Sequence, residues 1–260
     1  MAEVRVLLVN HASRVLGRDE LIAGARALQL QLSTDFRAAW GVDARLAVAE
    51  PAAPGSGREA ATWVVGLFER GEDARQAGFH DLTAAGRPVG QVFVAGKDGS
   101  LRRDWTVVAG HELIEMLVDP LLNRAFVAGE VMAAEVVDPV TGDDPYEVDG
   151  RPVPNFVLPA WFGRGAGPFD QKRTLSGPLQ LCPRSSIAVL EGGRWVERVN
   201  RTDRIVAVAD ASMDEGTDRR LELRSGAKPS ASDPIWTSDP IWTSDPIWTS
   251  DPIWTSRPSG

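Results

Sequence analysis

The residues best suited to chemistry are a histidine and two glutamates in the segment His111-Glu-Leu-Ile-Glu115, followed by a further glutamate, Glu135. On an α-helix, His111 and Glu115 lie one turn apart on the same face, so both side chains can reach a single cation. Glu112 points about 100° away, where it can act as a general base on a metal-bound water molecule. One histidine and two carboxylates form a ligand set that Zn²⁺, Fe²⁺ or Mn²⁺ accepts. The spacing therefore predicts a metal site whose ligands are His111, Glu115 and Glu135.

The helix that carries this motif is predicted at Trp105–Val118. Asp104 is the expected N-cap, and Asp119-Pro120 ends the helix because the residue before a proline avoids the α region. Apolar residues cover most of its circumference, so the helix should be buried and its polar stripe should line a cleft or be paired. A strand predicted at Pro88–Ala95 would form the rim of that cleft. The alternative is a buried helix whose histidine and glutamates simply hydrogen-bond within the core.

The stretch from His111 to Pro120, with Glu135-Val-Val-Asp-Pro139 after it, resembles the gluzincin branch of the zincin metallopeptidases and uncharacterised bacterial proteins of zincin-like type. In gluzincins, His-Glu-x-x-His is followed about twenty residues later by a glutamate ligand, and the first motif glutamate is the general base. The resemblance covers residues 75–170 approximately. It implies a metallopeptidase in which His111 and Glu135 bind zinc and Glu112 activates water. Glu115 stands where the family has its second histidine, which lowers the positive charge of the site and weakens the preference for zinc over iron, manganese or copper.

Other residues are candidates for supporting roles. Asp119 could orient the base or bind the metal, although helix termination explains it equally well. Asp138 could hydrogen-bond a ligand, but an Asp-Pro turn also explains it. Tyr146, the only tyrosine, could play the part of the oxyanion donor that zincins often carry. His80 could face the cleft, although a lone histidine is more often structural.

The remaining pattern predicts a mixed α/β (α+β) domain over residues 1–205, with a zincin-like mixed sheet and an active-site helix. Apolar runs predict strands at 4–9 and 44–49, and a strand or a short helix at 62–68. Spacings of three and four residues predict a helix at 18–40. Residues 138–184 are rich in proline and glycine, which favours irregular but packed structure. Residues 186–190 and 195–199 should form a hairpin around Glu191-Gly-Gly193.

Composition limits the function classes. The net charge of −8 argues against binding to nucleic acid. No apolar run is long enough to cross a bilayer, and the N-terminal residues do not resemble a signal peptide. The single cysteine, Cys182, excludes an intramolecular disulfide. We therefore expect a cytoplasmic protein.

The C-terminal region has a different character. Residues 206–231 read as a linker, and residues 232–260 form a tail in which Ser-Asp-Pro-Ile-Trp-Thr occurs four times without change. A proline in each six-residue unit rules out a helix, so the tail should be extended and disordered. It would expose four tryptophans: Trp236, Trp242, Trp248 and Trp254. The repeats could be a neutral expansion, a partner-binding segment or a substrate, and in the last case they resemble the core sequences of fused precursors of ribosomally made peptides.

Three functions remain open from the sequence. The leading one is a metal-dependent hydrolase of metallopeptidase type that acts on a peptide. The second is a metalloenzyme that modifies or crosslinks its own repeats, which a linker of this length would hold near the site. The third is a non-catalytic zincin-like scaffold that binds a partner through the tail.

Overall fold

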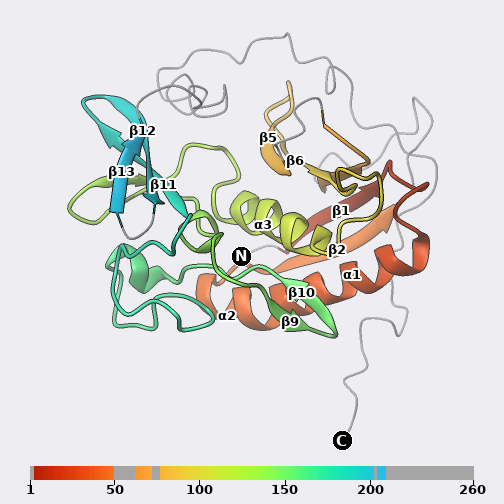
Figure 1. The fold of residues 1–260 in the computed structure, drawn as a ribbon, viewed down its shortest axis with the longest axis horizontal. Coiled ribbons are helices and arrows are strands. Elements are labelled where there is room, and N and C mark those ends of the chain that lie inside the picture. The colour runs from red at the N-terminus through yellow and green to blue at the C-terminus, as the bar shows by residue number, and fades with distance from the viewer. Residues whose placement is uncertain (1–2, 50–61, 72–76, 202–203, 209–260) are drawn as a thin grey trace, which may run out of the picture.

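The computed structural model describes residues 3–49, 62–71, 77–201 and 204–208 (Figure 1). The described residues form a mixed α/β structure with two five-stranded sheets and a two-stranded sheet. This agrees with the predicted α/β (α+β) class. The predicted loop at residues 51–57, most of the linker and the whole repeat tail lie outside the described residues.

The first sheet has the strand order β2-β1-β4-β6-β5. Its four parallel strands are β1 (Val4–Asn10), β2 (Ala44–Ala49), β4 (Thr62–Phe68) and β6 (Pro88–Phe93). The central strands are apolar because both faces of the sheet are buried, as is usual for parallel strands. The strands predicted at 4–9, 44–49 and 88–95 are confirmed, and 62–68 is a strand rather than a helix.

An unpredicted strand, β5 (Gly78–Leu82), pairs antiparallel with β6 and forms one edge of this sheet. The segment 88–95, predicted to be the rim of the cleft, instead lies inside the sheet between β4 and β5. The strand that borders the motif helix at the edge is therefore β5, and it carries His80.

Two long helical segments pack against the first sheet. One runs through α1 (Arg18–Gln31), the π-helical turn η1 (Leu32–Phe36) and α2 (Arg37–Trp40), and it ends at Gly41, whose φ of 69° is left-handed. The other is α3 (Trp105–Val118), which contacts β5 and β6 and has the predicted bounds. A Cβ at Gly24 of α1 would lie 2.2 Å from the Trp105 ring, so glycine is needed where α1 passes this end of α3.

The C-terminal part of the described chain contains the second sheet, whose strand order is β13-β12-β11-β8-β7. Its strands are β7 (Ala125–Val127), β8 (Val131–Ala133), β11 (Ser186–Glu191), β12 (Arg194–Arg201) and β13 (Arg204–Val208). The predicted hairpin is confirmed as β11–β12. β13, the last strand of the described chain, ends at Val208.

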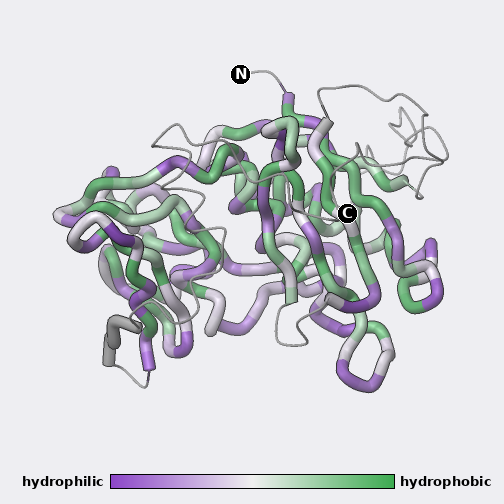
Figure 2. The backbone as a smooth tube through the Cα atoms, turned by 90° about the horizontal axis from the view of Figure 1, so that it is seen from above, coloured by the Kyte–Doolittle hydropathy of each residue, from purple (hydrophilic) through white to green (hydrophobic). Residues whose placement is uncertain are grey.

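The segment between β8 and β11 is largely irregular, as predicted for 138–184. It contains the small hairpin of β9 (Tyr146–Val148) and β10 (Arg151–Val153) and two short 3₁₀ turns, η2 (Asp138–Val140) and η3 (Pro159–Phe162). Figure 2 shows hydrophilic residues at the turned ends of several loops and hydrophobic residues along many of the segments between them. Among the described helices, none combines the length and the hydropathy that a membrane span needs.

Candidate metal centre

Two overlapping groups of histidine and carboxylate side chains lie where α3 meets β5 and the segment 135–138. One group is His111, Glu115 and Asp138, and the other is His80, Glu112 and Glu115. In each group, one potential ligand atom per residue lies within 4.8 Å of the others. Glu115 belongs to both groups.

His111 contacts two carboxylates through the same ring nitrogen. Its Nε2 lies 3.0 Å from Oε2 of Glu115 and 3.3 Å from Oδ1 of Asp138. Two ligands on a tetrahedral ion, each about 2.1 Å from it, are about 3.4 Å apart. The nitrogen and oxygens of this group therefore have the spacing and chemistry that a divalent cation requires.

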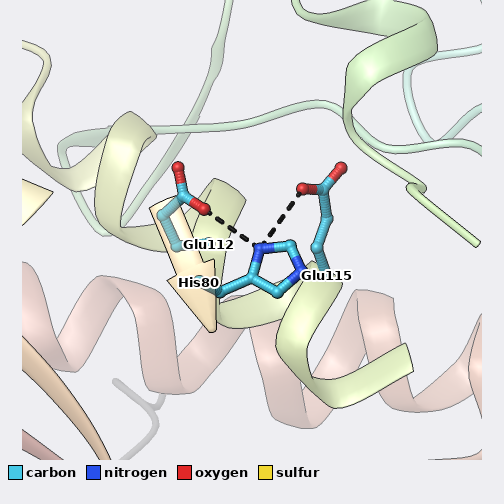
Figure 3. A group of neighbouring side chains, drawn as sticks. All are labelled: His80, Glu112 and Glu115. Carbon is cyan, nitrogen blue, oxygen red and sulfur yellow. Dashed lines mark hydrogen bonds and ion pairs between the residues drawn. The ribbon is translucent and has the colours of Figure 1, made fainter. Parts of the chain in front are cut away.

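His80 extends from β5 toward the polar face of α3. Its Nδ1 lies 3.2 Å from Oε2 of Glu112 and 3.9 Å from Oε2 of Glu115. Figure 3 shows the imidazole between the two carboxylates, with both contacts made through Nδ1. The other ring nitrogen, Nε2, lies 3.7 Å from Oε2 of Glu135. His80 is thus surrounded by three acidic side chains.

Glu115 is fixed by backbone hydrogen bonds. Its Oε1 accepts the N–H of Val137 at 3.0 Å and the N–H of Asp138 at 3.2 Å. These bonds join α3 to the segment that follows β8 and direct Oε2 toward both histidines. The side chain is only 3% exposed, so the position of Oε2 is set by the fold and not by solvent.

Glycine allows β5 to approach Glu112. A Cβ at Gly78 would lie 2.9 Å from Oε1 of Glu112 and 2.9 Å from the backbone oxygen of Gln91. Such contacts are too short, so any larger residue would displace either the strand or the carboxylate. The sequence of β5 therefore sets the space around Glu112 as well as providing His80.

In the first group, the charges of neighbouring side chains and burial together shift the pKa of each residue. Burial lowers the pKa of His111, but Glu115, Asp138 and Glu112 outweigh it and hold that pKa well above its ordinary value. Burial would raise the pKa of Glu115, yet His111 and His80 hold it below its ordinary value. Burial and the neighbouring Glu115 raise the pKa of Asp138 to about 6. Without a cation, a proton on His111 therefore compensates part of the negative charge.

The structure brings together most of the predicted site residues, with one exchange. His111 and Glu115 are adjacent, as predicted, but the third member of their group is Asp138. Glu135, the predicted third ligand, is buried and faces Nε2 of His80 instead. The physical reason is the bond from Glu115 to the backbone at 137 and 138, which turns Asp138 toward His111.

Two predicted supporting residues have structural partners. Asp119 accepts the N–H groups of Asn123 at 2.9 Å and Arg124 at 2.8 Å, so its carboxylate organises the turn after α3. The Tyr146 hydroxyl donates to Asp35 at 2.8 Å and accepts from Gln31 at 3.0 Å. Burial first, and then Asp35, raises the pKa of that phenol. Tyr146 is thus bonded to the α1–η1 segment and is not a member of either group. The tail tryptophans lie outside the described residues.

His80 is the residue that sequence reasoning underestimated. The chain has three histidines, and two of them meet at this site. The third, His11, stacks on Phe68 with ring centroids 4.6 Å apart. Two features of the sequence were available as signals for His80. Histidine is scarce in the chain, and His80 lies only a few residues before a predicted strand.

Comparison of the chain with models of protein families, with curated proteins and with solved structures finds no match. The chemistry proposed below therefore depends on the residues and distances described above.

Proposed function

We propose that this protein is a metal-dependent hydrolase of metallopeptidase type, with a cation held by His111, Glu115 and Asp138. The observation that carries the proposal is the convergence of these three side chains on one point, with Glu112 and His80 beside them. Three protein ligands leave coordination positions open, as catalytic sites require. Zinc is the first cation to test, followed by iron, manganese and copper.

When bound, the cation would act as a Lewis acid that polarises a carbonyl and lowers the pKa of water. Glu112 would accept the proton from that water and return it to the leaving amine of a peptide. His80 supports this role because its Nδ1 lies within hydrogen-bond distance of Glu112, at 3.2 Å, and can hold the carboxylate in place. Both side chains are only 9% exposed, which limits competition from bulk water.

We also propose that the first sheet, together with α3, is zincin-like. The mixed sheet, with an antiparallel edge strand next to the helix that carries His111 and Glu112, supports this relationship. We place the activity in the cytoplasm, in agreement with the single cysteine of the chain.

The test is peptide hydrolysis by the metal-loaded protein and by Glu112→Gln. This substitution preserves the shape of the side chain and removes its basicity, so we expect turnover to fall roughly a hundredfold to ten-thousandfold while one cation stays bound. Glu147→Gln, an exposed glutamate on β9, is the matched control and should retain full activity. Unchanged cleavage by Glu112→Gln would show that Glu112 is not the base.

A second candidate is modification or crosslinking of the protein's own repeats. Two features favour it: carboxylates outnumber imidazoles around α3, which suits iron or manganese, and the tail repeats one sequence four times without change. The intact mass of protein produced with its native metal should then differ from the sequence mass by multiples of one increment, located in residues 232–260. The increment should be absent in His111→Ala.

An unmodified tail in metal-loaded protein would rule out this second candidate. If neither cleavage nor a mass change is found, and the protein binds no metal, the remaining possibility is a scaffold that binds a partner through its Pro-Ile-Trp units.

A further inference from the structure

The two side-chain groups share Glu115, and this overlap points to more than one cation. We propose that the centre holds two divalent cations, one at His111, Glu115 and Asp138 and a second at His80, Glu112 and Glu115, with Glu115 as the shared ligand. The inference rests on the metal site of the proposed function and adds a second binding position to it.

The position of Glu115 suits a shared ligand. Oε2 lies 3.0 Å from Nε2 of His111 on one side and 3.9 Å from Nδ1 of His80 on the other. Oε1 already accepts two backbone N–H groups, so it is Oε2 that faces both imidazoles. A single carboxylate oxygen that lies within 4 Å of both histidine nitrogens is in position to contact the cation that each of them would bind.

His80 supplies an independent indication of a ligand. Its side chain is 9% exposed, and Nε2 has no hydrogen-bond partner among the described residues. The Nδ1 atom of His80 faces the carboxylates of Glu112 and Glu115, and Nε2 faces the carboxylate of Glu135 at 3.7 Å. Metal-bound histidines usually have a carboxylate near the ring nitrogen that does not bind the metal, so this is the orientation of a ligand.

The charge of the site also favours two cations. Four carboxylates surround two imidazoles at this centre, from Glu112, Glu115, Glu135 and Asp138. Among the described residues, no lysine or arginine forms an ion pair with Glu112, Glu115 or Asp138. A buried negative charge is costly unless it is compensated. Glu112, Glu115 and Asp138 carry three negative charges, so one divalent cation would leave one of them uncompensated and a second cation would compensate it.

Imidazoles and carboxylates on facing elements are the ligands of dinuclear iron and manganese centres, so these metals fit the pair better than zinc. The second cation changes the assignment of one residue. In the singly loaded centre Glu112 accepts a proton, whereas in the doubly loaded centre its Oε2 binds the second cation. Two cations would lower the pKa of a bound water, and its proton would pass to bulk solvent rather than to Glu112.

The test is titration of the metal-free, full-length protein with Mn²⁺, followed by native mass spectrometry and electron paramagnetic resonance. We expect two equivalents to bind, and the signal of isolated Mn²⁺ to weaken as the second enters, because ions that share an oxygen are magnetically coupled. His80→Asn should bind one equivalent without this loss of signal. His11→Asn is the matched control, because His11 lies outside both groups, and it should bind two.

Glu115→Gln tests the shared ligand without removing the hydrogen bonds from the backbone at residues 137 and 138. The Gln oxygen can still accept the N–H groups of Val137 and Asp138, but the NH₂ group that replaces Oε2 cannot bind a cation. We expect both affinities to fall at least about tenfold.

The possible results separate the two proposals. Binding of a single equivalent by the wild type at saturating Mn²⁺, or of two by His80→Asn, would overturn the second site. One bound equivalent together with peptide cleavage would leave the hydrolase standing without it. Two bound equivalents with no cleavage of any peptide would support the dinuclear centre and contradict the hydrolase.

Discussion

The two carboxylate oxygens of Glu115 have different surroundings, and this explains why a glutamate occupies the position. Oε1 accepts two backbone N–H groups, while Oε2 faces the histidines. A neutral imidazole has only one acceptor nitrogen, and a cation would occupy it. A histidine at this position could therefore bind a metal only by leaving the N–H groups of Val137 and Asp138 without an acceptor.

We therefore predict that Glu115→His, which restores the His-Glu-x-x-His pattern, destabilises the protein by about 1–3 kcal/mol because two buried donors lose their acceptor. Urea unfolding of the metal-free variant measures this change. Glu115→Gln is the control, and its stability should remain closer to that of the wild type. A Glu115→His variant that binds zinc more tightly at no cost in stability would show that the backbone contacts are unimportant.

The raised pKa of His111 predicts how cation affinity depends on pH. In the metal-free protein Glu115 and Asp138 outweigh the effect of burial and raise the pKa of this imidazole, which favours its protonated form. A cation must displace that proton, so affinity should rise about tenfold per pH unit below the pKa of His111. Calorimetry in two buffers of different ionisation enthalpy would detect the released proton, and a pH-independent affinity would contradict the assignment.

The raised pKa of His111 makes cation affinity rise with pH, but it makes the stability of the metal-free fold fall with pH. A raised histidine pKa contributes stability that is fully present below about pH 6.5, the ordinary value, and is lost as the pH rises through the pKa of His111. The pKa of Asp138, raised to about 6, also lowers stability as the pH rises above its ordinary range. Asp138 is 34% exposed, so solvent screening limits this second effect to about 1 kcal/mol.

At the scale of elements, the motif helix was predictable and the strand beside it was not. α3 follows its predicted bounds because apolar periodicity and the Asp119-Pro120 stop agree. Asp104 stands at the predicted N-cap position, but its carboxylate accepts hydrogen bonds from Arg102 and does not cap the helix. β5 has the sequence Gly-Phe-His-Asp-Leu, which includes two residue types of low strand propensity, glycine and aspartate. Its structure depends on pairing with β6, which no local pattern shows. The scarcity of histidine in the sequence pointed to His80, but its position beside α3 depends on that pairing.

The exchange of Glu135 for Asp138 has a similar origin. Spacing along the sequence selected Glu135, but the ligand position depends on how the chain turns between β8 and η2. That turn is set by the bonds from Val137 and Asp138 to a side chain twenty-odd positions earlier. A contact of this range is a property of the tertiary structure.

The close approach of β5 and α3 predicts that Gly78→Ala disturbs the second group. The added methyl would meet Glu112 and the backbone of Gln91, so we expect a loss of about 1–3 kcal/mol and weaker binding of the second cation than of the first. Thermal unfolding and metal titration measure the two effects. Gly177→Ala is the control, because a Cβ there meets no atom within 4 Å. Equal behaviour of the two variants would contradict the described packing.

At the scale of the whole molecule, all six residues of the centre lie between positions 80 and 138. We therefore predict that removal of residues 209–260 leaves metal affinity and the cleavage of an added peptide unchanged within about twofold. Removal of the tail would abolish only reactions in which it is the substrate. A large loss of metal affinity in the shortened protein would show that the tail itself contributes a ligand, which would contradict the assignment to the six residues.

Metal binding should also stabilise the molecule as a whole, because the centre joins β5, α3 and the 135–138 segment. A cation at about a hundred times its dissociation constant would add about 2.7 kcal/mol if it does not bind the unfolded chain. This stabilisation also makes affinity measurable from thermal unfolding for variants that bind weakly.

The most direct test compares the affinity for the first cation in Asp138→Asn and Glu135→Gln, by titration of the metal-free proteins. Asp138 belongs to the His111 group, whereas Glu135 faces His80. We predict that Asp138→Asn loses affinity at least about tenfold and that Glu135→Gln stays within about threefold of the wild type. A large loss in Glu135→Gln, with Asp138→Asn unaffected, would contradict the site described here.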